Sequence, residues 1–393
     1  MAMQWPEAHR PPSNVWGTPI AWLIPPLAAM IGGIGVATLY SVAGGSMDPW
    51  AMRHVMRLIM GFALMFGLPL VPAQFWMRLA YPIYVIALVL VAAVLVRGTQ
   101  AFGAQRWLVL GPVSVQPSET MKLALILVLA RYFQQLPAKS IANPLAVLVP
   151  AILVAVPMLL ILKQPDLGTA VLLTVTGLIL IFLAGVPLQY FAAGAAGVAA
   201  VAPVAWAFLH GYQKERLLVF WDPAIDPLGK GYQIFQSKIA LGSGGLAGKG
   251  FLQGTQSQLD FVPEKHTDFV FALWAEETGF VGSMCLIGLF IALIWCLILL
   301  ALRSRSIFAR LLITGVAVSL FLHVFVNISM VVGLAPVVGV PLPLISYGGT
   351  SLFSLLIGVG IALGVSGEAE DIPRAAYLHR NRVWPLKPRI SRL

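Results

Sequence analysis

Charged residues are scarce in this chain of 393 residues. They make up 10% of it, against roughly 25% in an ordinary soluble domain, whereas 59% of the residues are hydrophobic. A soluble protein of this length could not bury so many apolar side chains, and its surface would carry large adhesive patches. The composition therefore excludes soluble, disordered and collagen-like chains and predicts a protein of the lipid bilayer.

Cysteine is also rare, and no basic tract is dense. The two cysteines, Cys285 and Cys296, lie in one apolar run, which excludes a disulfide scaffold and argues against a cysteine metal site. The net charge is +10, but the basic residues are scattered among apolar runs, so nucleic acid is not an expected partner. Ser-His-Asp, HExxH and paired-cysteine motifs are missing, which argues against a soluble-type hydrolase or zinc peptidase.

Long apolar runs, in contrast, are abundant. A helix needs about 20 apolar residues to cross the hydrocarbon core. Windows of this kind cover 19–42, 55–73, 76–96, 119–136, 145–162, 168–186, 188–209, 268–300, 308–333 and 349–367. The eighth is too long for one perpendicular crossing, so we expect it to tilt or to begin outside the membrane. The predicted fold is an all-α polytopic membrane protein with about ten transmembrane helices in residues 19–367.

The basic residues near the ends of the spans predict the orientation. An even number of spans puts both termini on one side, and the basic segments 301–310 and 368–393 place that side in the cytoplasm. Residues 1–18 and 368–393 are then cytoplasmic tails, and 210–267 is a large outer loop between the seventh and eighth helices. Six outer cations that lie outside the nearly neutral long loop weaken the expected charge bias: Arg53, Arg57, Arg97, Arg106, Lys122 and Lys163.

Ionisable groups at the edge of the apolar region are costly, which makes them candidates for function. Glu119 and Lys122 are three residues apart and share one face of a helix that starts near Pro117. They form either a simple intrahelical ion pair or, together with Arg106, a cationic pocket for an anionic head group. Asp166 precedes the sixth span, where it is equally well interpreted as an N-cap or as a functional charge.

The outer loop is far longer than usual connections, which indicates a function. Lys238 lies in it, and a glycine-rich run ends at Lys249 and Gly250. That run either cradles phosphate or is a flexible, close-packed loop, and the lack of a GK[ST] ending makes it a weak signal. At the end of the loop, Asp268 lies at the water–lipid boundary, where partial desolvation favours a usable base. His266 and Asp268 are alternatively a capping pair.

A last polar group lies near the C-terminus. His323 and Asn327 are one turn apart in the ninth span, and prolines and the segment 346–350 follow. Irregular backbone at membrane depth is tolerated only where it is buried in protein or lines a cavity. His323 alone is more often a satisfied hydrogen-bonding group between helices than a ligand.

Four segments of the chain closely resemble the SEDS family of cell-wall polymerases. They are 106–133 with PSETMK, 163–170 with KQPDLGTA, 229–283 with HTDF, and 341–351 with LISYGGTS. GSGGLAGKG and GTQSQL are more similar to the rod-shape branch of the family than to its division branch. The resemblance extends over all ten predicted helices.

The resemblance implies a peptidoglycan glycosyltransferase that joins lipid II units at the outer face of the bacterial inner membrane during cell elongation. It implies a class B penicillin-binding protein as the transpeptidase partner, the elongation machinery as context, a divalent cation such as Mg or Mn, and no organic cofactor. The essential acid of the family corresponds to Asp268, its paired Glu and Lys to Glu119 and Lys122, and its RW arginine to Arg106. Glu119 or Asp268 could hold the cation.

In the mechanism this implies, Asp268 takes the proton from the 4-hydroxyl of the acceptor sugar. Cations stabilise the departing diphosphate, and one displacement inverts the anomeric centre. The expected substrate-binding residues are Arg106, Glu119, Lys122, Asp166, Lys238, Lys249 and His266. One rival is a flippase of the same precursor, which would need charges along a route on both sides of the bilayer. Another is a scaffold, for which Asp268 would be dispensable.

Overall fold

The computed structural model describes residues 18–101, 104–110, 113–208, 214, 230–258 and 264–367. A helix lies in each predicted window: α1 (Pro19–Val42), α2 (Ala51–Gly67), α3 (Ala73–Arg97), α4 (Pro117–Gln135), α5 (Pro144–Lys163), α6 (Leu167–Leu183), α7 (Leu188–Phe208), α11 (Val270–Arg303), α12 (Ile307–Val332) and α13 (Gly349–Ser366). Within the described residues, seven helices have the length and hydropathy of a membrane span. The helical polytopic fold is confirmed, while the number of ten spans stays a prediction.

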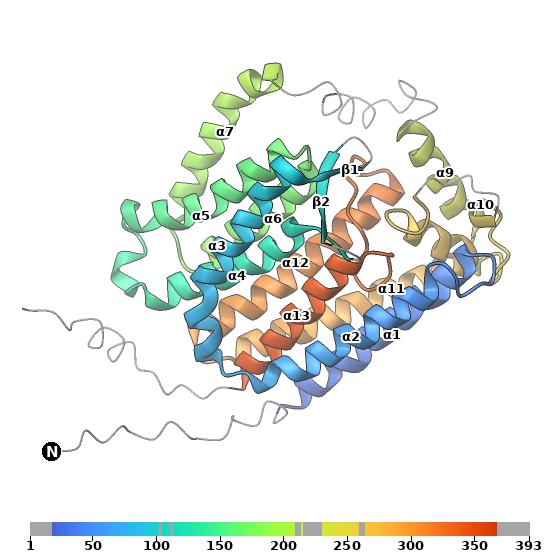
Figure 1. Cartoon of the computed structure of the whole chain (residues 1–393), viewed down its shortest axis with the longest axis horizontal. Coiled ribbons are helices and arrows are strands. Elements are labelled where there is room, and N and C mark those ends of the chain that lie inside the picture. The colour runs from blue at the N-terminus through green and yellow to red at the C-terminus, as the bar shows by residue number, and fades with distance from the viewer. Residues whose placement is uncertain are drawn as a thin grey trace, which may run out of the picture.

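The helices form a bundle around α12, which contacts α4, α6, α11 and α13. Figure 1 shows α1 running beside α11, α2 beside α13, and α7 extending away from the bundle. The start of α1 and the end of α13 lie at the same end of the bundle (Figure 1), as an even number of spans requires. The predicted tails, apart from Thr18, lie outside the described residues, as do 210–213, 215–229 and 259–263 of the predicted outer loop.

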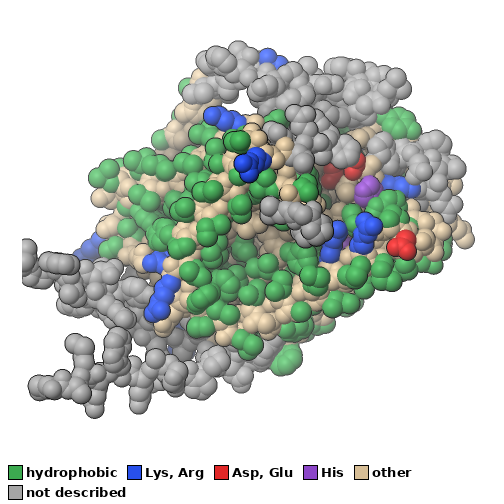
Figure 2. All heavy atoms as spheres, viewed as in Figure 1, with side chains coloured by type: hydrophobic (Ala, Val, Ile, Leu, Met, Phe, Trp, Pro, Cys, Tyr) green, Lys and Arg blue, Asp and Glu red, His purple; other side chains and the backbone are tan. Residues whose placement is uncertain are grey.

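Apolar side chains cover most of the visible face (Figure 2). Large hydrophobic residues such as Ile59, Ile291 and Phe325 are more than half exposed. A soluble protein rarely exposes such an extended apolar surface, whereas a membrane protein turns it toward lipid. Basic, acidic and histidine side chains lie together at the right of the view (Figure 2).

A small sheet between α3 and α4 departs from the predicted all-helical fold. Strands β1 (Thr99–Ala101), β2 (Ala104–Leu110) and β3 (Val113–Val115) pair antiparallel in the order β1-β2-β3. Strands β1 and β3 have only three residues each, and the seven residues of β2 do not alternate between apolar and polar, so the sequence shows no strand pattern. The sheet matters for the site because β2 carries Arg106 and contacts both α3 and α4.

The long eighth run contains a break, which the sequence did not predict. Gly279 has φ 68° and ψ −162° within α11. The backbone groups near the break pair with the glycine-rich run: Phe280 N donates to Gly245 O (2.9 Å), and Lys249 N donates to Glu276 O (3.0 Å). A side chain at Gly279 would collide with the backbone of Gly248. The glycine-rich run is therefore a close-packed segment against α11, flanked by α9 (Lys230–Ser243) and α10 (Thr255–Gln258).

Candidate active site

The backbone around Asp268 is fixed by the C-terminal part of the chain. Tyr347 N donates to His266 O (2.8 Å), Ser346 Oγ donates to Thr267 O, and Asn327 Nδ2 donates to Asp268 O (2.8 Å). The backbone carbonyl groups of residues 266–268 therefore all accept hydrogen bonds from the segment 327–347, for whose polar residues the sequence predicted no role.

Asp268 lies in a turn just before α11. The N-cap position belongs to Phe269 and has no side-chain cap. Asp268 is half-buried, and because the N-cap position belongs to Phe269, the geometry disfavours the interpretation of His266 and Asp268 as a capping pair.

Arg106 and Asp268 approach the same point of the 334–348 segment. A Cβ atom built on Gly339 would lie 3.5 Å from Asp268 Oδ2 and 3.6 Å from Arg106 Nη1. Gly339 also has a positive φ of 73°, which favours glycine. The predicted base and the predicted cation for the diphosphate therefore meet at a position without a side chain.

Arg106 is anchored by the segment before α6. Its Nη2 donates to Pro165 O (2.9 Å), and its Nε lies 3.7 Å from Asp166 Oδ2. Asp166 is almost fully buried and also accepts from Thr169 N (3.3 Å) and Gln116 Nε2 (3.4 Å). Asp166 therefore caps α6, as one of the two interpretations predicted, and it also lies against Arg106. Its functional role stays a prediction.

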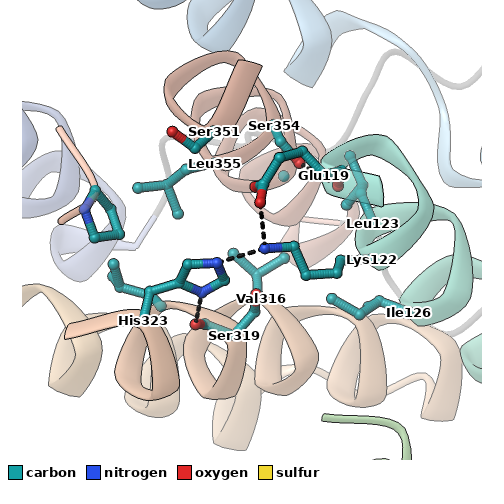
Figure 3. A pocket seen from close by; sticks show the side chains of 13 residues that line it. Glu119, Lys122, Leu123, Ile126, Val316, Ser319, His323, Ser351, Ser354 and Leu355 are labelled. Carbon is teal, nitrogen blue, oxygen red and sulfur yellow. Dashed lines mark hydrogen bonds and ion pairs between the residues drawn. The ribbon is translucent and has the colours of Figure 1, made fainter. Parts of the chain in front are cut away.

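Glu119 and Lys122 form a buried ion pair at the start of α4. Lys122 Nζ lies 2.7 Å from Glu119 Oε1, and the ammonium also contacts His323 Nε2 from α12. Glu119, Lys122 and His323 border a cavity of about 40 Å³. Figure 3 shows Ser351 and Ser354 of α13 on the wall of this cavity. The ion pair therefore borders a cavity, but Arg106 is not among the residues that line it. The predicted cationic pocket that joins Arg106 to Glu119 and Lys122 stays a prediction.

His266 lies in an aromatic cluster. Its ring stacks on Trp50 with 4.8 Å between ring centroids and lies 6.1 Å from the ring of Tyr347. The guanidinium of Arg57 sits 4.3 Å above the ring of Tyr347. Burial lowers the pKa of His266, an effect that Lys265 reinforces and Glu264 opposes. His266 is therefore neutral at neutral pH. The contacts of the His266 ring with Trp50 and Tyr347 were not predicted from the sequence.

The two loop lysines make contacts of other kinds. Lys249 Nζ lies 2.6 Å from Oε1 of the fully buried Glu276, which also accepts from Gln256 N. Lys238 packs over Gly333 at the C-terminal end of α12, where a positive charge is favourable. These contacts give both lysines structural roles, and their contact with substrate stays a prediction.

The acidic residues of the described part of the chain do not cluster as metal ligands do. The described part of the chain holds no group of three His, Cys, Asp or Glu residues that could bind a metal ion. Glu119 pairs with Lys122 and Asp166 lies against Arg106, so neither fits. Mg²⁺ is commonly held by one or two carboxylates plus substrate phosphates, so a cation shared between Asp268 and the substrate stays a prediction.

Comparison with known proteins identifies the family. The family model described as cell cycle protein, FtsW/RodA/SpoVE, matches residues 21–371. The chain belongs to this family. Peptidoglycan glycosyltransferase MrdB of Escherichia coli (strain K12) is 45% identical over 315 residues, which cover 80% of this chain and 84% of that protein. The probable peptidoglycan glycosyltransferase FtsW of Coxiella burnetii is 38% identical over 325 residues, covering 81% and 87%.

Solved structures extend the similarity to the fold. The rod shape determining protein RodA of Thermus thermophilus aligns with a TM-score of 0.66 and 32% identity over 88% of this chain and 96% of that chain. A chain from a structure on polymerization and crosslinking by a peptidoglycan synthase complex aligns with a TM-score of 0.76 and 36% identity, covering 88% and 97%. The predicted family is confirmed.

Proposed function

We propose that this chain is a peptidoglycan glycosyltransferase that polymerises lipid II on the outer face of the bacterial inner membrane during cell elongation. The convergence of Asp268 and Arg106 on Gly339 carries the proposal. Glycosyl transfer from a diphosphate donor needs a base at the acceptor hydroxyl and positive charge at the leaving group. The names of the similar glycosyltransferases support the same activity.

Asp268 is the general base in this proposal. It removes the proton from the 4-hydroxyl of the acceptor sugar as that oxygen attacks the anomeric carbon of the donor. The bond to the diphosphate breaks, the electron pair leaves with the diphosphate, and the single displacement inverts the anomeric centre. Arg106 and Lys122 bind the departing diphosphate through charge-assisted hydrogen bonds. Asn327, Ser346 and Tyr347 hold the base in place through the backbone.

A divalent cation, Mg or Mn, belongs to the same proposal. Asp268 and the substrate phosphates would hold it, and it would supply additional charge stabilisation for the leaving group. The proposal includes no organic cofactor. Both termini are cytoplasmic in it, as the basic segments at 301–310 and 368–393 indicate.

A class B penicillin-binding protein is the proposed partner. The solved chain from a peptidoglycan synthase complex supports this, because that complex is described as coordinating polymerization with crosslinking. The exposed apolar faces of the helices offer ample area for a partner's transmembrane segment.

The direct test is glycan-strand formation from purified lipid II. The chain is assayed with its class B partner and a divalent cation, and penicillin silences crosslinking. Asp268→Asn keeps the shape of the side chain but removes the base, and Asp48→Asn is the matched control because Asp48 is exposed. We expect polymer from the wild type and the control and none from Asp268→Asn.

The other outcomes separate the alternatives. Absence of polymer from all three proteins contradicts the proposal and directs attention to lipid II flipping in liposomes. Equal polymer from all three means that the base is elsewhere or that the partner performs the reaction, as a scaffold function requires.

A further inference from the structure

Lys122 is held from two sides at the interface of α4 and α12. Glu119 contacts its ammonium from the same helix, and His323 contacts it from the opposite helix (Figure 3). The three side chains are 4%, 3% and 5% exposed for Glu119, Lys122 and His323. Ionisable groups this deeply buried in a membrane protein persist only where they are partnered, and they mark functional positions.

The hydrogen bonds assign the protons. His323 Nδ1 lies 2.6 Å from Ser319 O. A backbone carbonyl only accepts, so Nδ1 carries the proton. Lys122 only donates, so Nε2 must offer its lone pair. The contacts are satisfied by a neutral imidazole that accepts from Lys122 and by an ionised Glu119 that accepts from the same group.

This arrangement leaves one N–H group of Lys122 for a ligand. An ammonium group has three N–H bonds in tetrahedral geometry. One N–H bond points to Glu119 and a second points to His323. The tetrahedral geometry then fixes the direction of the third N–H bond. Lys122 also lines the cavity that Ser351 and Ser354 border.

We propose that His323 is a positioning residue for Lys122. In its neutral, Nδ1-protonated form it directs the remaining N–H group of Lys122 toward a phosphate oxygen of the lipid-linked diphosphate. This inference rests on the proposed function, because it assigns Lys122 to the leaving group. The alternative is a histidine that only joins two helices and contributes stability.

The charge state of His323 gives the inference a second consequence. Protonation at Nε2 would turn the acceptor into a donor that faces the Lys122 ammonium, so the contact would be lost. The titratable groups that face His323 in the cavity are Lys122 and Glu119 from α4. The remaining residues that line the cavity are uncharged. They include Ser351 and Ser354 from α13, Pro343 before that helix, and Ser319 from α12, the helix of His323. Acidification should therefore uncouple Lys122 through His323.

The test compares His323→Gln and His323→Leu in the lipid II polymerisation assay. Glutamine can donate to Ser319 O and accept from Lys122 without titrating, whereas leucine can do neither. Thr176→Val is the control, because Thr176 is a buried polar residue on α6 that bonds only Leu172 O. For each protein, kcat and KM are measured from about pH 4 to 8, together with the melting temperature, because burial and the Lys122 ammonium both oppose protonation of His323.

We expect His323→Leu to lower kcat/KM about tenfold, the lower end of losses seen when a supporting partner is removed. His323→Gln should recover most of that activity near pH 7 and should lose activity less steeply than the wild type on acidification. Thr176→Val should leave kcat/KM unchanged.

Two results would overturn the inference while leaving the proposed function intact. In one, His323→Leu lowers the melting temperature but retains the wild-type kcat/KM. In the other, His323→Gln is as impaired as His323→Leu, or it keeps the acid response of the wild type. Absence of polymer from the wild type would instead overturn the proposed function and this assignment with it.

Discussion

Asn327 joins two segments of the site through one amide group. Its Nδ2 donates to Asp268 O (2.8 Å) and to Val340 O (2.7 Å), and its side chain is fully buried. Asn327→Ala removes both donors. A buried carbonyl left without a donor costs about 1–3 kcal/mol, so we expect the free energy of unfolding to fall by about 2–5 kcal/mol.

The same substitution should impair catalysis more than binding. The carbonyl that Asn327 holds belongs to the proposed base itself. A displacement of about 1 Å in a reacting group can cost about 100-fold in rate. We therefore expect Asn327→Ala to lower kcat for glycan polymerisation by about this factor, with a much smaller change in KM.

The assay combines initial polymerisation rates with thermal unfolding in detergent. Asn143→Ala is the control, because Asn143 is exposed and only caps α5 through Leu145 N (3.1 Å). That cap is worth about 1 kcal/mol, and its loss should leave kcat unchanged. Wild-type melting and wild-type kcat in Asn327→Ala would refute the reasoning.

Three further predictions concern other parts of the site. Arg106→Lys keeps the charge but loses the planar fork that reaches Pro165 O and Asp166 together, so kcat/KM for lipid II should fall about tenfold. Glu276→Gln removes the carboxylate that holds Lys249, so limited proteolysis within 249–256 should be faster than in the wild type. Burial lowers the pKa of His266 from 6.5, so the unfolded chain binds the proton more readily than the folded one. The melting temperature should therefore fall as pH drops below about 6.5, and less steeply in His266→Gln.

Hydropathy predicted the helices because a membrane span is a local property of about 20 residues. The break in α11 could not be predicted in this way. A glycine is tolerated within an apolar run, and the partners of the freed backbone groups lie in the preceding loop. The three strands could not be predicted for a related reason. Each strand is defined by its pairing with a neighbouring strand and not by a pattern in its own sequence.

The same distinction applies to the site. The contact of Glu119 with Lys122 follows from a spacing of three on a helix, and the cap by Asp166 follows from its place before α6. The contacts of Asn327 with Asp268 and of His323 with Lys122 bridge 59 and 201 residues. Only the packing of α12 against its neighbours creates them, so the sequence could supply the residue types but not their pairing.

The break in α11 also bears on how the protein is made. Open backbone groups are costly within a bilayer unless protein satisfies them. The run at 245–250 that pairs with them precedes α11 in the chain, so it leaves the ribosome first. The nascent helix therefore meets its own partner as soon as it emerges, and the break can close without waiting for α12 or α13 to be synthesised.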